Sequence, residues 1–166
     1  MILQRLQSVF LFLAMVLMVI FSFQPFMQFA TGEGEYVVSA LGAKMLGVAT
    51  TDSEALNESL AAMDYSWVIF GLSILVSIFT LITIFSFKNL KKQKGLCMIT
   101  VMLIVALVAS IVLTVNGLMV GLNVDMSMIK WGVPATFPVL AIILILIARG
   151  YIAKDQKILS SYDRIR

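Results

Sequence analysis

Four long apolar runs constrain this chain more than any other feature of its sequence. They cover residues 6–27, 65–87, 96–117 and 131–149. A helix rises about 1.5 Å per residue, so each run is long enough to cross a hydrocarbon core of about 30 Å. In lipid every backbone polar group needs an internal partner, which a helix supplies. We therefore predict an all-α membrane protein built as an antiparallel four-helix transmembrane bundle.

The composition lies outside the range of soluble domains. Of the 166 residues, 61% are hydrophobic and 13% are charged, whereas a soluble domain has roughly 45–50% apolar and about 25% charged residues. We expect residues 1–166 to form a single four-span membrane domain. The first run exceeds the core of a cleavable signal peptide and no small-x-small site follows it, so we expect it to remain as a span.

Charge is distributed unevenly between the two ends of the predicted spans. Four lysines lie in the short connection formed by residues 88–95. Of the 12 Lys and Arg residues, all except Lys44 and Lys130 lie in this connection or near the chain ends. Of the nine Asp and Glu residues, all except Asp155 and Asp163 lie on the opposite side. Because basic residues collect in cytoplasmic loops, we predict that this basic loop and both termini are cytoplasmic.

The long polar segment, residues 30–64, is predicted to form a small β-containing extracytoplasmic cap. Within residues 32–48, β-branched and aromatic residues bounded by glycine favour short strands. An isolated hairpin is only marginally stable, so we expect it to pack on the bundle and to pair with part of residues 118–129. Residues 51–64 show helical spacing and predict a short surface helix. The side chains expected to face the bundle are Tyr36, Val38 and Met45.

Prolines lie near the outer ends of two predicted spans. Pro25 is close to the end of the first run, and Pro134 and Pro138 are close to the start of the fourth. Proline fits the first turn of a helix because its missing N–H is not needed there. We therefore expect Pro134 to begin the fourth helix and Pro138 to kink it.

The C-terminal tail, residues 150–166, is predicted to continue the fourth span as an amphipathic helix. Its apolar residues recur at helical spacing between basic residues. One hypothesis is that the tail lies on the inner membrane surface or docks on a cytoplasmic partner; the other is that its charges only anchor topology. Basic residues near anionic headgroups contribute about 1 kcal/mol each. The apolar positions are Ile152, Ile158, Leu159, Tyr162 and Ile165.

The sequence contains no pattern typical of catalysis or of metal binding. Histidine is absent, no P-loop, GxSxG or HExxH motif is present, and no apolar run carries an ionisable residue in its interior. We predict no catalytic, cofactor-binding or metal site, no cofactor, and no enzyme activity. Cys97 is interpreted as a small apolar residue. An unusual membrane enzyme would need Asn116, Asp125 and Lys130 around one pocket.

Both ends of the chain resemble one known family. The start reads MILQRLQSVF, and residues 146–166 read LIARGYIAKDQKILSSYDRIR, with a Lys-Asp pair, a Ser and a closing Asp-Arg-apolar-Arg. These segments are similar to those of a family of small four-span inner-membrane proteins of Bacteroidetes, known as domain of unknown function, family 4293. The resemblance implies a location in the bacterial inner membrane and carries no known activity.

These features favour a structural or interaction protein, such as an accessory subunit of an envelope complex. The alternative is a channel or carrier for a small neutral or apolar solute, and a membrane-embedded enzyme comes third. The expected partners are a bilayer with anionic headgroups, at the basic loop and tail, and a membrane protein. No nucleic acid is expected.

Overall fold

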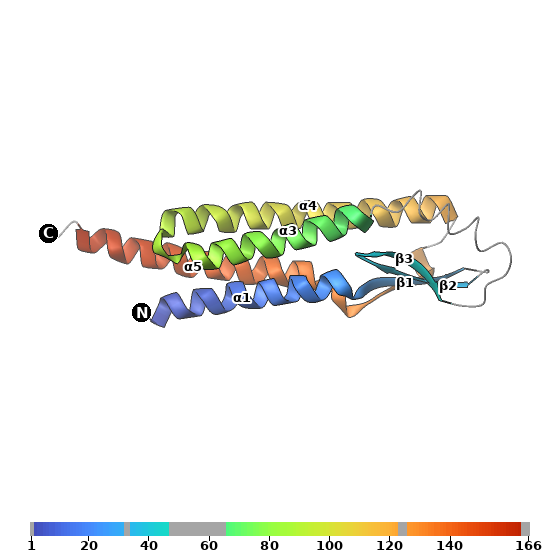
Figure 1. Ribbon diagram of the computed structural model, residues 1–166, viewed down its shortest axis with the longest axis horizontal. Coiled ribbons are helices and arrows are strands. Elements are labelled where there is room, and N and C mark those ends of the chain that lie inside the picture. Colours follow the sequence, from blue (N-terminus) through green and yellow to red (C-terminus); the bar gives the residue numbers. More distant parts are fainter. Residues whose placement is uncertain (1, 32–33, 47–65, 123–125, 164–166) are drawn as a thin grey trace.

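A computed structural model describes residues 2–31, 34–46, 66–122 and 126–163. Its four long helices run side by side, with both chain ends at one end of the molecule and the strands near the other (Figure 1). All four are long and apolar enough to cross a membrane. Their bounds are α1 Ile2–Phe23, α3 Ser66–Phe85, α4 Leu90–Leu122 and α5 Phe137–Asp163.

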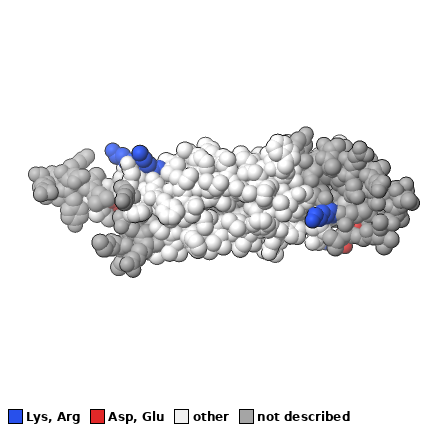
Figure 2. Space-filling model, viewed as in Figure 1, with Lys and Arg blue, Asp and Glu red and all other residues white. Residues whose placement is uncertain are grey.

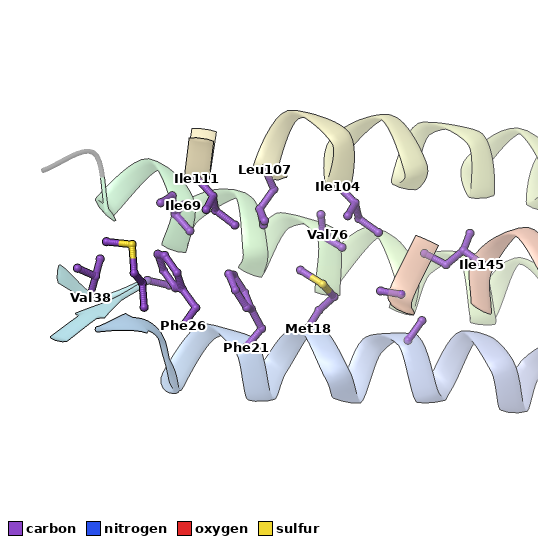
Figure 3. Packing of buried hydrophobic residues seen from close by; sticks show 14 of the residues in the cluster. Met18, Phe21, Phe26, Val38, Ile69, Val76, Ile104, Leu107, Ile111 and Ile145 are labelled. Carbon is purple, nitrogen blue, oxygen red and sulfur yellow. The ribbon is translucent and has the colours of Figure 1, made fainter. Parts of the chain in front are cut away.

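The helices form a closed four-membered ring. Helix α1 packs against α3 and α5, and α4 packs against the same two helices from the opposite corner. Large apolar side chains from all four meet along the axis, among them Met18, Val76, Ile104 and Ile145, each completely buried (Figure 3). The antiparallel bundle predicted from the apolar runs is confirmed as a fold.

Four strands form the cap, and the prediction of strands within residues 32–48 is confirmed. Strand β2, Gly34–Ser39, pairs with β3, Gly42–Leu46, through a tight turn in which Gly42 has φ 140°, a conformation that glycine tolerates best. Strand β1, Pro25–Thr31, and strand β4, Ile129–Trp131, complete an antiparallel sheet in the order β3-β2-β1-β4. The predicted pairing of the second outer connection with the cap is therefore correct, although β4 starts only at the last residue of the range proposed for it.

The sheet buries one face against the end of the bundle opposite the chain termini. Tyr36 and Val38 are buried as predicted, and Tyr36 stacks on Phe29 of β1 with ring centroids 5.1 Å apart. A bulge between Pro25 and Met27 turns Phe26 inward, where its ring lies 5.6 Å from that of Phe21. This aromatic contact joins the sheet directly to the end of α1. The side chain of Met45 lies outside the described residues, as do residues 51–64 with their predicted helix.

Two helix ends differ from the span bounds expected from the sequence, and proline explains the first of them. The first span was expected to reach residue 27, but α1 ends at Phe23 because Pro25 cannot continue the helix and instead begins β1. The fourth span was expected to start at residue 131, but that residue ends β4, and a 3₁₀ turn, Val133–Thr136, precedes α5. Pro138 is then the second residue of α5, where no kink is required.

The basic loop is shorter than residues 88–95. A 3₁₀ turn, Ser86–Lys88, leads to Asn89, whose side-chain oxygen accepts a hydrogen bond from the Lys92 backbone N–H at 3.3 Å. This is the geometry of a helix N-cap, and α4 begins at Leu90. Three of the loop lysines therefore lie on the first turns of a helix.

Helix α5 continues through most of the tail, as predicted. It runs without a break to Asp163 and extends beyond the start of α1 (Figure 1). Ile152, the first residue of the predicted apolar stripe, is buried in the bundle, whereas Ile158 is 51% exposed. The side chains of the remaining three stripe residues lie outside the described residues.

Candidate functional site

The end of the bundle that carries both chain termini has a polar core, and we use the name inner end only as a label for this place in the fold. Gln7 of α1 and Gln93 of α4 are completely buried at the positions where the neighbouring turns place apolar side chains. Gln93 donates a hydrogen bond from Nε2 to the backbone oxygen of Thr83 in α3 at 3.3 Å. The rings of Phe10 and Tyr151 stack with centroids 5.9 Å apart. Because α1 and α5 are antiparallel, this contact places Gln7 near the level of Lys154 and Asp155. We call the three polar residues Gln7, Thr83 and Gln93 the inner polar layer.

Several polar atoms in and near this layer have no hydrogen-bond partner within the described part of the chain. Both amide atoms of Gln7, Oε1 of Gln93 and Oδ2 of Asp155 are buried and unpaired. The same holds for Nε of Arg149, which lies less than one turn before Ile152. Leaving a buried polar group unpaired costs about 1–3 kcal/mol, so these groups are unusual in a core and mark this end as the candidate site.

Cys97 lies one turn deeper than Gln93 on the same face of α4. It is completely buried, which agrees with its interpretation as a small apolar residue.

On α5, Tyr151 lies on the side that contacts α1, because its ring stacks on that of Phe10. Arg149, two residues earlier, lies on the other side of the buried positions Ala148 and Ile152, which is the side of α5 next to α4.

Basic side chains surround this polar layer on the outside of the bundle. Lys91 and Lys92 are exposed and Lys94 is half-buried on the first turns of α4. Lys154 is exposed, with its Nζ 5.9 Å from the centroid of the Tyr151 ring. Figure 2 shows such basic side chains at the end of the molecule from which α5 projects, while the middle of the bundle carries no charge on the visible face.

The polar side chains within the spans are mostly occupied by their own helices. The hydroxyls of Ser77, Thr80, Thr83, Thr100 and Thr114 each donate to the backbone oxygen four residues earlier, at 2.7–3.0 Å. Those hydroxyls are thus satisfied locally and are not arranged as a relay. Above the inner end, the apolar layers seen in Figure 3 fill the axis.

An open apolar groove runs between the second half of α1 and the middle of α3. Its volume is about 230 Å³, and it faces the outside of the bundle rather than its axis. At its floor Ser22 donates a hydrogen bond to Ser73 at 2.8 Å, joining the two helices. The lining residues are Met15, Val19, Ser22, Phe23, Ile74, Ser77, Ile78 and Leu81.

The described structure does not bring together at one site the three polar residues considered for a membrane enzyme. Asn116 is exposed on α4 and Lys130 is exposed on β4, while Asp125 lies outside the described residues. No group of three or more His, Cys, Asp or Glu side chains that could hold a metal ion occurs among the described residues.

The sequence contained a signal for Gln7 and Gln93 that our prediction did not use. Gln7 lies four residues before Leu11, and Gln93 four residues before Cys97, so each occupies a position of the buried helical repeat. Because Gln93 lies among lysines in the sequence, its neighbours predict a solvated loop. Only the start of α4 at Leu90 turns it toward the core.

These features define a class: a four-helix bundle of membrane-spanning length, capped by a four-stranded sheet and closed at its other end by a polar layer. The model of a family described as domain of unknown function (DUF4293) matches residues 3–165. The chain belongs to this family, as the resemblance of its two ends indicated. No curated protein matches it.

Proposed function

We propose that this protein is a non-catalytic integral protein of a bacterial inner membrane that acts as a structural or interaction subunit of an envelope complex. In this proposal both termini and the basic end of the bundle are cytoplasmic, and the sheet lies on the outer side. The charge distribution supports the orientation, because all 12 Lys and Arg residues except Lys44 and Lys130 lie at the start of α4 or just before it, or belong to the parts of the chain near its two ends. Anionic headgroups are then natural partners of the basic end.

The observation that carries the proposal is that large apolar side chains fill the axis of the bundle. Met18, Ile104, Ile145 and Val76 are completely buried between the inner polar layer and the cap. A transported polar solute would need these side chains to separate. A rigid packed core suits a protein that presents surfaces to a partner better than one that opens a path.

Recovery of partners tests this proposal. The full chain would be purified in a mild detergent after crosslinking in cells, and proteins that copurify would be identified by mass spectrometry. We expect one or a few membrane proteins in stoichiometric amount. A chain that crosslinks to nothing beyond abundant membrane proteins would contradict the proposal.

The tail provides a matched pair of variants for the same experiment. Replacing Ile158, Leu159 and Tyr162 by serine should leave insertion intact, because topology is set by charge, while reducing partner recovery if the tail docks. Replacing Arg164 and Arg166 by glutamine tests the electrostatic part. If both variants retain their partners, the tail serves only as an anchor.

The groove between α1 and α3 favours a second candidate function, a carrier for an apolar solute. Its lining is almost wholly apolar, and it opens toward the surrounding lipid. Purified chain in liposomes should then accelerate the exchange of a fluorescent apolar probe between membranes or leaflets. Equal exchange with and without the chain would exclude this function.

A further inference from the structure

We propose that the seam between α4 and α5 at the inner end binds the phosphate of a phospholipid headgroup, with Arg149 as the anchor. The proposal deepens the proposed function and rests on one part of it, the location of the chain in a bilayer. It names a particular lipid site in place of a general attraction between a basic surface and anionic lipid.

Arg149 is the first reason for this assignment. Its side chain is half-buried within the candidate span Val133–Ile158, and its Nε is buried without a hydrogen-bond partner in the described part of the chain. A guanidinium near hydrocarbon is costly unless an anion or several acceptors neutralise it. Cys97, buried on the neighbouring helix α4, carries a thiol and not a carboxylate.

The surroundings of Arg149 fit a phosphate. Lys94 lies three residues before Cys97, so the two are neighbours on the surface of α4, and Lys94 is half-buried. On α5, Ala153 and Gln156 follow Arg149 by four and seven residues and share its face. The seam therefore offers a guanidinium, an ammonium and an amide, with a small alanine between two of them. Arg recognises phosphate by paired N–H donors, and basic sites between membrane helices bind lipid headgroups.

The location favours a lipid over free phosphate. Beyond Arg149 toward the cap, both helices of this seam carry exposed apolar side chains, including Met102 and Val105 on α4 and Leu146 on α5. The acyl chains of a lipid whose phosphate lies at Arg149 would run along this apolar surface. Inorganic phosphate would gain the charge contacts but none of the apolar burial.

The test uses the full purified chain in detergent, with thermal unfolding as the readout. Phosphatidylglycerol is titrated against the chain, and diacylglycerol with the same acyl chains and inorganic phosphate are titrated separately. We expect saturable stabilisation by phosphatidylglycerol alone. Arg149→Gln should weaken the apparent affinity by about tenfold or more, the factor for one charge-assisted hydrogen bond, and Arg149→Lys should weaken it less.

Lys92→Gln is the matched control, because it removes the same charge from an exposed position two residues before Lys94. We expect it to leave the affinity within about twofold of the unaltered chain, since surface charges add little individually. Equal losses for Lys92→Gln and Arg149→Gln would overturn the proposal in favour of diffuse attraction. Stabilisation by diacylglycerol or by inorganic phosphate as strong as by phosphatidylglycerol would also overturn it.

Failure of this site is distinguishable from failure of the proposed function. A chain that binds phosphatidylglycerol at Arg149 but crosslinks to no partner loses its role as an interaction subunit and keeps its lipid site. A chain that recovers partners equally well with Arg149→Gln, and shows no lipid-dependent stabilisation, keeps its role and loses the site.

Discussion

The two buried glutamines of the inner polar layer resemble each other in sequence but differ in their bonds. Gln93 donates to the Thr83 backbone oxygen and so satisfies a carbonyl in the last turn of α3, whereas both amide atoms of Gln7 are unpaired. We therefore predict different effects on stability. Gln7→Leu should raise the thermal midpoint in detergent because it removes two unpaired polar atoms. Gln93→Met should raise it less or lower it, because it removes the unpaired Oε1 but also takes away the hydrogen bond to the Thr83 carbonyl.

Leu11→Ala, one turn from Gln7 along α1, serves as the reference for a lost core side chain. Leu11 is 1% exposed, so this change should cost about 2–5 kcal/mol. If Gln7→Leu instead destabilises the chain, the Gln7 amide has a partner in the native membrane protein, such as an ordered water or a lipid group.

Two glycines form a second matched pair at the scale of single residues. A Cβ placed on Gly132 would lie 3.1 Å from the Pro25 backbone oxygen and 3.5 Å from that of Phe26, whereas one on Gly71 would meet nothing within 4 Å. Gly132→Ala should therefore lower the thermal midpoint by straining the contact between β1 and the residue that joins β4 to the 3₁₀ turn. Gly71→Ala, on the exposed face of α3, should raise the free energy of unfolding by up to about 1 kcal/mol and therefore raise the thermal midpoint. If the thermal midpoint rises for both variants, β1 can move away from the new Cβ without loss of stability, and this prediction is wrong.

Among helices, α1 and α3 approach closely because the side chains between them are small. Ser73 is completely buried and shares a hydrogen bond with Ser22; small residues at such positions let helix backbones approach in membranes. Ser73→Leu should force the two helices apart at a cost of about 1–3 kcal/mol. Leu75→Ala, at a 38% exposed position of α3, should change the midpoint little. A stable, monodisperse Ser73→Leu variant would contradict this packing argument.

The elements that the sequence predicted well are those fixed by one dominant physical rule. An apolar run of membrane length has no alternative to a helix in lipid, so the four helices could be predicted. The ends of the helices are instead set by single residues, whose local backbone preferences compete with that rule. Asn89 caps α4 inside a run of lysines, and Pro25 diverts an apolar stretch into a strand. The inner polar layer follows from the same detail, since Gln93 is buried only because α4 starts before it.

At the scale of the whole molecule, the cap and the bundle depend on each other. The sheet draws strands from both outer connections and rests on aromatic residues that continue the core of the helices, as Phe21 and Phe26 do. Burial of Tyr36 and Val38 could be predicted, because a lone hairpin lacks a stabilising surface. The position of β4 within its connection could not be predicted, because a strand of three residues is too short to show an alternation of apolar and polar residues.

The orientation of the whole molecule yields the last prediction. In a background in which Cys97 is replaced by alanine, single cysteines would be introduced at Lys92 and at Lys44, both exposed and near opposite ends of the bundle. A membrane-impermeant maleimide added to cells with a permeabilised outer membrane should label Lys44→Cys and spare Lys92→Cys, because basic residues are retained on the cytoplasmic side. Lysed cells should show labelling at both sites, which establishes that each cysteine is reactive. Labelling of Lys92→Cys in intact cells, with protection of Lys44→Cys, would reverse the topology and place the inner polar layer and Arg149 on the outer side of the membrane.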